Sequence, residues 1–386
     1  MRALVATTAG AGHFAALLPF AAALRDAGHA VRVAAPASFA SAVRRAGFAH
    51  VPLADAPPHE LGTVLARLPG LSRENAASAV MVSEVFAGLY ARAALPAMRA
   101  VVEAWRPDLL LRETAEFASY VVAERTGVPH VQVAMSLASV EAFMHAQVDG
   151  ALRALGSPSG PAGLRAAPRL TLVPASLEDS GTPSAPETSR FRPPTLPASA
   201  PDLPPEWWPA STAPLVYVTF GSVAAGVGFF PDFYRDVLTA LADLPVRILL
   251  TLGEAGDPER LAPVPSNVHV ERWWPQEQVM PRAAAMVTHG GFTTTLLGLS
   301  AGLPMVVVPL FALDQYTNAR RIQAVGAGIA LDDSLAAPTR VRSALEQVLN
   351  DDTYRAAARR VADEMAHLPH PSASVPVLEA LAKHAA

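Results

Sequence analysis

Short apolar segments alternate with helical segments along both halves of the chain, and this alternation limits the fold more than any other feature. Ala3–Ala6 is an apolar run, and the helix expected after it carries apolar residues at a spacing of three to four and ends near Gly28. Ala30–Ala35 then completes a βαβ unit. Strands that are apolar throughout are typical of parallel sheets covered by helices on both faces, so the sequence predicts an α/β fold.

The same pattern continues to the end of the chain. Leu170–Val173 is expected to be the last strand of the first half. The other expected strands are Phe48–Leu53, Leu109–Leu111, His130–Ala134, Leu215–Phe220, Val246–Thr251, Val268–Val270, Met286–Thr288 and Met305–Val308. The expected helices are Ser38–Ala46, most of Leu61–Trp105, Phe117–Thr126, Phe230–Leu244, Thr293–Ala301, Gln315–Val325 and three pieces after about Pro338.

A proline-rich segment separates the two halves. Between Pro183 and Pro214 lie ten of the 36 prolines of the chain, and proline is excluded from helix interiors and central strands. We therefore expect an extended linker and two doubly wound domains, residues 1–205 and 212–368, with a last helix in 369–386 that returns to the first domain. In such folds ligands bind at the carboxyl ends of the strands, here in the cleft expected between the domains.

The composition excludes several classes of protein. The chain has 386 residues, of which 51% are hydrophobic and 17% charged, and its formal net charge is −4. Such a chain can bury a large core, and it lacks the basic balance of a nucleic-acid-binding protein. Because it contains no cysteine, disulfide scaffolds, thiolate zinc sites and thiol nucleophiles are excluded, and a reducing, cytoplasmic location is expected.

The uncharged stretch Ala3–Leu24 has a signal peptide as its alternative interpretation. Thr7, Thr8 and His13 interrupt it, and it fits the first βαβ unit well, so we expect it to be folded. No other stretch reaches the roughly 18–20 uninterrupted apolar residues of a membrane span, and none is expected.

A glycine-rich turn follows the strand expected at Met286–Thr288. His289 is followed by two glycines, which allow a ligand to approach the backbone, and Thr293 or Thr294 is expected to cap the next helix. The first turn of that helix offers amides and a positive dipole end, which suit a diphosphate. His289 can donate to the same oxygens. The alternative is an ordinary strand-to-helix turn with a structural histidine.

Two further motifs flank this turn. Pro275 restricts Trp274 to an extended conformation, and a tryptophan held in this segment offers a flat face to a nucleobase. A pair of core tryptophans is the alternative. Asp314 and Gln315 follow the strand that ends at Pro309, and a carboxylate beside a carboxamide is suited to binding sugar hydroxyls. A helix N-cap by Asp314 is compatible with that role.

The order Trp-x-Pro-Gln, His-Gly-Gly, Asp-Gln resembles the donor-binding signature of the family 1 glycosyltransferases, which have two Rossmann-like domains in the arrangement called GT-B. The chain is most similar to the actinomycete enzymes that attach sugars from dTDP- or UDP-sugars to antibiotics and other natural products. The resemblance covers essentially the whole chain, because Gly12-His13, Thr219–Ser222 and Pro369–Pro371 also match segments of the family.

The resemblance implies a role for each motif. Trp273 would stack on the base while the backbone of Trp274 bonds its edge. His289, the backbone amides of Thr293 and Thr294, and the Ser222 side chain would hold the diphosphate. Asp314 and Gln315 would bind the sugar hydroxyls. The implied donor-binding residues are Gly221, Ser222, Trp273, Trp274, Gln276, His289, Gly290, Gly291, Thr293, Thr294, Asp314 and Gln315.

Three features of the sequence depart from the family pattern. Leu297 stands where plant-type members have a glutamate that binds ribose hydroxyls, and since a deoxyribose lacks the 2′-hydroxyl, this favours dTDP over UDP. Phe292 and Thr293 replace the usual Ser-Gly of bacterial members, which makes the phosphate loop bulkier. Pro309 and Asp314 are separated by one residue more than in the commonest spacing.

His13 lies where the first strand meets the first helix. Histidine, with an ordinary pKa of about 6.5, can remove a proton from an alcohol at neutral pH, and the family uses this histidine as a general base. Family members often orient it with an aspartate at the position of Glu113, and Glu116 is the substitute candidate. The alternatives are a histidine that only packs or caps, and acids that are solvated at a helix start.

The expected reaction is an inverting single displacement that needs no metal and no cofactor beyond the nucleotide sugar. The chain lacks a clear Asp-x-Asp motif, and the helix dipole with His289 would replace a divalent cation. The partners are a nucleotide sugar and a bulky apolar aglycone, with no nucleic acid or membrane, and the chain would be a monomer or homodimer. Candidate acceptor contacts, which core packing explains equally well, are Met81, Phe86, Phe143 and Met144.

Three other functions compete with this one. A UDP-glucose-dependent enzyme that inactivates drugs would share the fold and the reaction class. A nucleotide-sugar 2-epimerase would share the architecture but needs carboxylates around the sugar in place of His13. A non-catalytic helper protein is disfavoured by the intact set of His13, His289, Asp314 and Gln315.

Overall fold

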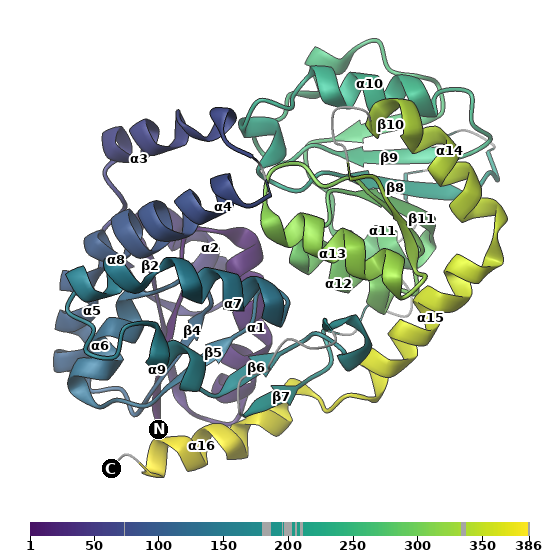
Figure 1. The fold of residues 1–386 in the computed structure, drawn as a ribbon. Helices are drawn as coiled ribbons and strands as arrows, with labels where there is room; N and C mark the ends of the chain where they lie inside the picture. The colour runs from purple at the N-terminus through teal and green to yellow at the C-terminus, as the bar shows by residue number, and fades with distance from the viewer. Residues whose placement is uncertain are drawn as a thin grey trace. The chain divides into compact units, whose positions relative to one another are not determined.

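The computed structural model describes residues 1–72, 74–179, 187–194, 196, 203–204, 207–208, 211–332 and 337–384 (Figure 1). The chain divides into two compact units. Unit 1 comprises Met1–Val173, Glu178–Pro193 and Leu368–Ala386, and unit 2 comprises Pro174–Leu177 and Pro194–His367. Much of the proline-rich segment between Pro183 and Pro214 lies outside the described residues.

The described part of unit 1 contains a parallel sheet of seven strands in the order β3-β2-β1-β4-β5-β6-β7, flanked by helices (Figure 1). Its strands are β1 (Arg2–Ala6), β2 (Ala30–Pro36), β3 (Ala49–Leu53), β4 (Leu109–Glu113), β5 (His130–Val133), β6 (Arg169–Thr171) and β7 (Thr188–Arg190). Its helices are α1 (Ala11–Asp26), α2 (Ala40–Arg45), α3 (Pro58–Leu65), α4 (Ala76–Val80), α5 (Ala91–Trp105), α6 (Ala118–Thr126), α7 (Ala138–Gln147), α8 (Asp149–Ala154), α9 (Pro161–Ala166) and α16 (Val375–His384). A π-helical segment, Met81–Tyr90, joins α4 to α5, and α16 contacts α1.

The described part of unit 2 contains a parallel sheet of six strands in the order β10-β9-β8-β11-β12-β13. Its strands are β8 (Leu215–Thr219), β9 (Arg247–Thr251), β10 (Val268–Glu271), β11 (Ala283–Thr288), β12 (Met305–Val307) and β13 (Gly328–Ala330). Its helices are α10 (Asp232–Leu241), α11 (Gln276–Val279), α12 (Phe292–Ser300), α13 (Leu313–Ala324), α14 (Ala337–Asn350) and α15 (Asp352–His367). The α/β class and the two parallel sheets predicted from the sequence are confirmed.

Two of the sequence predictions about strands were wrong. Leu170–Val173 is not the last strand of the first half, because β7 follows it and pairs with β6 at the edge of the sheet. This three-residue strand is free of proline, and an edge strand needs hydrogen bonds on one side only. Strand β13 was missed because it has three residues and begins with a glycine, which gives little apolar signal.

Both sheets reverse their strand order at one place, and that place determines where a site can form. In unit 1 the chain runs from β1 to β2 on one side and later to β4 on the other, so the reversal lies between β1 and β4. In unit 2 it lies between β8 and β11. The loops that leave adjacent strands in opposite directions open a crevice at their carboxyl ends, where ligands of such folds bind.

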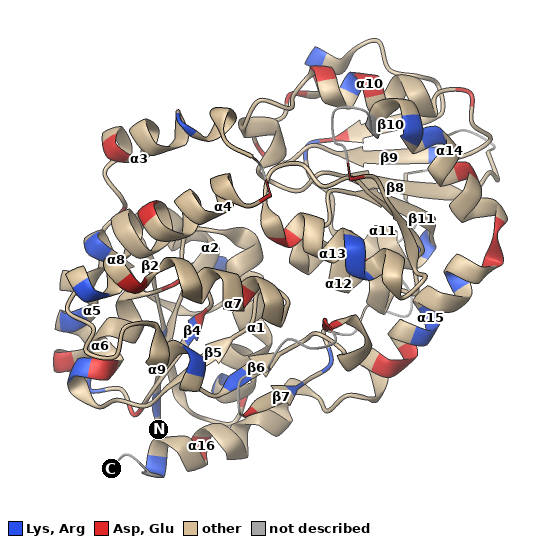
Figure 2. Cartoon of the chain, in the orientation of Figure 1, with Lys and Arg blue, Asp and Glu red and all other residues tan. Residues whose placement is uncertain are grey.

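Ala76–Trp105 is a continuous helical stretch of 30 residues that includes the π-helical segment. By length and hydropathy alone it could cross a membrane, and 44% of its most apolar window is buried in the fold. It packs against β3, α6 and α8. Charges of both signs are interspersed on outer helices such as α10, α14 and α15 (Figure 2).

Candidate active site

The strand-order reversal of unit 1 brings His13 and Glu113 together. His13 lies in the first turn of α1, just after β1, and Glu113 is the last residue of β4. The Nδ1 atom of His13 is 3.1 Å from Oε1 of Glu113. The Glu113 side chain has no exposed surface, whereas that of His13 is 19% exposed. A buried carboxylate therefore holds one ring nitrogen of a histidine that is still accessible to a ligand.

Neighbouring groups keep Glu113 ionised. Its carboxylate accepts hydrogen bonds from the Thr8 amide at 3.2 Å, the Thr8 hydroxyl at 3.0 Å and the Ala115 amide at 2.5 Å. Burial by itself would raise the pKa of Glu113, but the charge and hydrogen bond of His13, with the amides of Ala115 and Thr8, lower the pKa overall. The ionised carboxylate favours a positive charge on His13, as a general base requires.

Glu116, the other candidate from the sequence, is used differently. Its carboxylate accepts hydrogen bonds from the amides of Ala118 at 3.0 Å and Ser119 at 3.1 Å, at the start of α6. Burial raises the pKa of Glu116 to about 7. The sequence left open whether Glu113 or Glu116 contacts His13. In the structure it is Glu113, at the end of β4.

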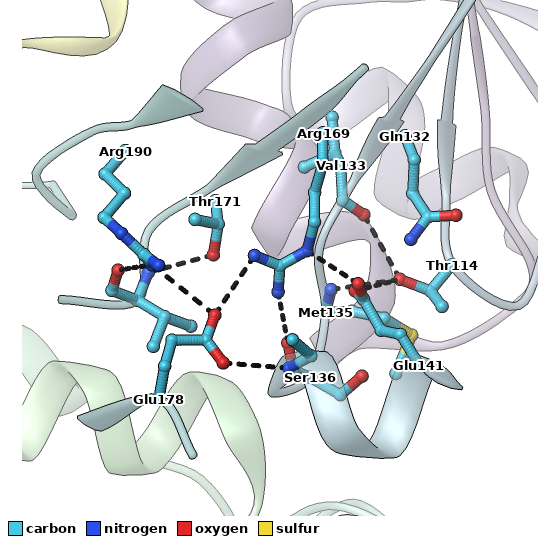
Figure 3. Close-up of polar contacts among 12 residues, drawn as sticks. Thr114, Gln132, Val133, Met135, Ser136, Glu141, Arg169, Thr171, Glu178 and Arg190 are labelled. Carbon is cyan, nitrogen blue, oxygen red and sulfur yellow. Dashed lines mark hydrogen bonds and ion pairs between the residues drawn. The ribbon is translucent and has the colours of Figure 1, made fainter. Parts of the chain in front are cut away.

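A buried network of charged residues supports the loop after Glu113, and none of its members was predicted from the sequence (Figure 3). The Thr114 hydroxyl donates to Glu141 at 2.8 Å, and the Arg169 guanidinium donates to Glu141 at 2.6 Å and to Glu178 at 3.1 Å. Arg190 also contacts Glu178, at 3.4 Å. Arg169 immediately precedes an apolar run, which is the one signal in the sequence that a charge is buried there.

A cavity of about 190 Å³ in unit 1 is lined by residues that contact the His13–Glu113 pair, although neither member of the pair is itself among its lining residues. Thr8, Phe86, Tyr90 and Glu116 are among its lining residues, and the Phe86 ring lies 5.7 Å from the His13 ring, centre to centre.

Of the candidate acceptor residues, Phe86 is therefore near the histidine. Met81 packs against a small cluster around Val85, while Met144 is buried and Phe143 half-buried in α7. Those three are not among the lining residues of this cavity.

The strand-order reversal of unit 2 places the predicted diphosphate turns side by side. His289 follows β11 and is 8% exposed, and its ring is enclosed by glycines. A Cβ atom would lie 2.7 Å from this ring at Gly221 and 2.4 Å from it at Gly291, so a side chain at either position would displace the histidine. Burial lowers the pKa of His289 to about 4, so the imidazole is neutral at pH 7.

The helix after this turn begins differently from the prediction. The N-cap of α12 is Gly291, with no side-chain cap, so the expected capping by Thr293 or Thr294 was wrong. Both threonines lie within the first turn, where glycine at the N-cap leaves the backbone open to a ligand. The Thr294 hydroxyl instead accepts a hydrogen bond from Gln276 at 3.4 Å.

The two adjacent tryptophans have different environments. Trp273 is 65% exposed, so it is no core residue, and its ring is available for stacking. Trp274 is half-buried against Trp207, at 4.8 Å between ring centres, and its Nε1 atom is buried without a hydrogen-bond partner among the described residues. The interpretation as a core pair therefore fails for Trp273.

The Asp-Gln pair lies at the start of α13. The N-cap of this helix is Ala312, so the capping role considered for Asp314 was wrong. Gln315 is buried, and its Oε1 accepts hydrogen bonds from the backbone amides of Leu310 at 2.8 Å and Phe311 at 3.1 Å. Its carbonyl oxygen thus holds the preceding loop, and only its amide group remains for a sugar.

Ser222 is exposed and follows Gly221, whose φ is +77°.

Among the described residues, no group of three or more His, Asp or Glu side chains is arranged to hold a metal ion.

Comparison with known proteins identifies the family to which the chain belongs. Residues 22–167 match the N-terminal domain, and residues 235–381 the C-terminal domain, of the erythromycin biosynthesis protein CIII-like family. The L-demethylnoviosyl transferase of Streptomyces niveus is 32% identical over 387 residues, covering 96% of each chain. The TDP-daunosamine transferase DnrS of Streptomyces peucetius is 29% identical and covers 100% of this chain and 98% of its own.

Solved structures agree with this assignment. The glycosyltransferase SnogD from Streptomyces nogalater has a TM-score of 0.75 and 27% identity, covering 99% of each chain. The glycosyltransferase SsfS6 from Streptomyces sp. SF2575, complexed with thymidine diphosphate, has a TM-score of 0.75 and 26% identity, covering 98% of this chain and 99% of its own. The chain is therefore a glycosyltransferase of the GT-B fold and belongs to the erythromycin biosynthesis protein CIII-like family.

Proposed function

We propose that this glycosyltransferase moves a deoxysugar from a dTDP-sugar to a hydroxyl group of an apolar natural-product acceptor, with inversion at the anomeric carbon. The observation that carries the proposal is the His13–Glu113 pair, with 3.1 Å between Nδ1 and Oε1, next to a largely apolar cavity. A histidine held by a buried carboxylate is what the activation of an alcohol needs.

The nature of the donor is supported by the relatives and by one residue. DnrS is named a TDP-daunosamine transferase, and SsfS6 was solved with thymidine diphosphate. In this chain the half-buried Leu297 stands in α12, eight residues after His289, and offers no carboxylate to a 2′-hydroxyl. A thymidine diphosphate, whose deoxyribose has no such hydroxyl, fits this position better than a uridine diphosphate.

The proposed reaction is a single displacement. His13 accepts the proton of the acceptor hydroxyl through Nε2 as the oxygen attacks C1 of the sugar, and the ionised Glu113 stabilises the imidazolium that forms. The bond from C1 to the diphosphate oxygen breaks at the same time, and the leaving group gains charge. Ser222, His289 and the first turn of α12 would stabilise that charge in the transition state more than in the ground state, which lowers the barrier.

The acceptor is expected to use the cavity beside His13. Apolar side chains such as Leu61, Phe86 and Phe117 line it together with the hydroxyl-bearing Thr8 and Tyr90. Such a lining suits a ring system that is mostly apolar and carries hydroxyl groups. Met81, Phe143 and Met144 stay weaker candidates, because the structure gives them other packing partners or a place in α7.

A two-part experiment tests the proposal. Thermal unfolding is measured with dTDP, UDP and GDP, since a ligand that binds only the folded state raises the melting temperature. Transfer is then measured by mass spectrometry with dTDP- and UDP-sugars and a panel of phenolic and polyketide acceptors.

We expect selective stabilisation by dTDP, and transfer that falls by about 10²–10⁴-fold in H13A without loss of dTDP binding. Selective stabilisation by UDP with glucose transfer would favour the drug-inactivating alternative. An unchanged rate in H13A would overturn the assignment of the base, and conversion of the donor without an acceptor would indicate an epimerase.

A further inference from the structure

Three neighbouring strands of unit 2 end in the same short motif. Threonine, any residue, glycine occurs at Thr219–Gly221 after β8, at Thr251–Gly253 after β9 and at Thr288–Gly290 after β11. The three threonines are register partners across the parallel sheet, Thr251 beside Thr219 and Thr219 beside Thr288. The motif therefore forms one row along the carboxyl edge, although its copies lie far apart in the sequence.

The backbone of each copy takes the same course. The φ angles of Gly221, Gly253 and Gly290 are +77°, +81° and +83°, values that favour glycine strongly. In the first and third copies the glycine amide donates to the threonine hydroxyl, at 3.4 Å in each case. Each strand thus turns sharply after its threonine.

The three glycines allow neighbouring loops to touch. A Cβ atom at Gly253 would lie 2.9 Å from the Cα of Ser222 and 3.1 Å from the carbonyl oxygen of Gly221. At Gly221 it would lie 2.7 Å from the His289 ring, and at Gly290 2.9 Å from the carbonyl oxygen of Gln315. The loop after β9 therefore supports Ser222, and the loop after β8 supports His289.

Buried hydroxyl groups connect the same row of threonines to Gln276 of the Trp-x-Pro-Gln motif. Gln276 donates to the Tyr217 hydroxyl at 3.4 Å, and that hydroxyl is 2.8 Å from the Thr251 hydroxyl. The Thr251 hydroxyl donates to Thr219 at 3.0 Å, and Thr219 accepts the Gly221 amide. Tyr217, Thr219 and Thr251 are all buried, so each hydroxyl depends on these partners for its hydrogen bonds.

We propose that Gly253 and Thr251, on strand β9 and its loop, are positioning residues for the donor diphosphate, because they hold Ser222 and Gly221 in place. The inference rests on the proposed function, which assigns the diphosphate to Ser222 and His289. Hydrogen-bond donors of this kind act only when they are placed within a fraction of an ångström, and a displacement of about 1 Å can cost about 10²-fold in rate.

The test compares two glycines that both have a left-handed backbone conformation but differ in their surroundings. Gly253 is packed as described, whereas Gly228 has a φ of +92° and nothing within 4 Å of the position its Cβ would take. Both G253A and G228A impose a side chain on a left-handed backbone, and only G253A pushes against Ser222. Steady-state rates give the KM for donor and acceptor, and calorimetry gives the Kd of dTDP and UDP.

We expect G253A to raise the donor KM and the nucleotide Kd about 10-fold or more, with the acceptor KM nearly unchanged, while G228A stays within about twofold of the wild type. T251V, which removes the hydroxyl without changing the shape, should shift the same two constants, and T251S should restore them. If G253A does not fold, the Thr251 pair decides the question by itself.

Two outcomes would overturn the inference. If G253A and T251V only lower the melting temperature and leave donor KM and nucleotide Kd unchanged, the row is structural and the proposed function stands. If the wild-type protein binds neither dTDP nor UDP, the proposed function falls, and the positioning role falls with it.

Discussion

The Nδ1 atom of His13 lies 3.1 Å from Oε1 of Glu113, and that carboxylate has no exposed surface. The pair joins the first turn of α1 to the end of β4, across the point where the strand order of unit 1 reverses. One ring nitrogen is thereby committed to an ionised partner, which leaves the other for a substrate.

Replacing Glu113 by glutamine tests this relationship through the pH profile. E113Q keeps the shape of the side chain but removes the negative charge that favours the imidazolium. We expect the rate to fall by about 10–10³-fold and the acid limb of kcat/KM to move to lower pH, because a proton then leaves the histidine more easily. Rates measured from pH 5 to 9 would show both effects.

A matched control exists elsewhere in unit 1. Glu379 of α16 lies 3.0 Å from Nε2 of His29 and is 39% exposed, which gives a second histidine–carboxylate contact outside the proposed site. E379Q should leave the acid limb in place. If the limb also stays in place in E113Q, Glu113 does not act on the base.

Glu116 should make folding stability depend on pH with a definite sign. Burial raises its pKa to about 7 from 4.5. A carboxyl group of this kind contributes stability that is fully present below about pH 4.5 and is lost as the pH rises through about 7, a total of roughly 3 kcal/mol. E116Q cannot ionise, so its free energy of unfolding should rise relative to that of the wild type between these pH values and level off above them.

Urea denaturation of both proteins at pH 4, 5.5 and 7.5 measures this difference. The buried His130, His145 and His289, whose pKa values burial lowers to about 3, 3 and 4, add an opposite slope. That slope is common to both proteins and cancels in the comparison. A difference that does not change with pH would mean that Glu116 is not neutral in the folded state near pH 6.

The buried charge network should make Arg169 far more sensitive than an exposed arginine. Arg169 contacts Glu141 at 2.6 Å, with side chains 2% and 5% exposed, and also contacts Glu178 (Figure 3). R169M leaves the buried Glu141 with the Thr114 hydroxyl but no cation, and leaves Glu178 with Arg190 at 3.4 Å, so it should cost about 3–5 kcal/mol of unfolding free energy.

The exposed pair of Arg92 and Glu60, at 2.5 Å with side chains 57% and 49% exposed, provides the comparison. R92M should change stability by less than about 1 kcal/mol. Chemical denaturation of the two variants measures their unfolding free energies. Equal losses of unfolding free energy would mean that burial does not set the strength of these contacts.

Trp273 should contribute to nucleotide affinity without contributing to stability. Its side chain is 65% exposed, so W273A removes little packing. Stacking of a base on an aromatic ring is worth about 1–3 kcal/mol, so the Kd of the nucleotide should rise about 5–150-fold. Calorimetric titration measures this, with V264A, at an exposed apolar residue of unit 2, as the control. An unchanged Kd in W273A would remove Trp273 from the base site.

The sequence by itself determined the architecture and the candidate residues of both sites. Alternation of short apolar strands and helices is written locally, because hydrophobic periodicity reflects burial on one or both faces. The Trp-x-Pro-Gln, His-Gly-Gly and Asp-Gln motifs are also local, because each consists of a few consecutive residues. The two wrong strand assignments concern β7, which has no apolar residue, and β13, which begins with a glycine, so neither gives the apolar run by which β6 and β12, of the same length, were recognised.

Only the tertiary structure decided which of these residues meet. Glu113 and Glu116 are three positions apart and chemically alike, and a β-strand that ends at Glu113 directs one carboxylate to His13 while the other bonds the start of α6. Gln315, expected on a sugar, uses its carbonyl oxygen on the loop before it. The row formed by Thr219, Thr251 and Thr288 depends on strand register, a non-local pairing across the sheet that no local pattern in a single sequence encodes.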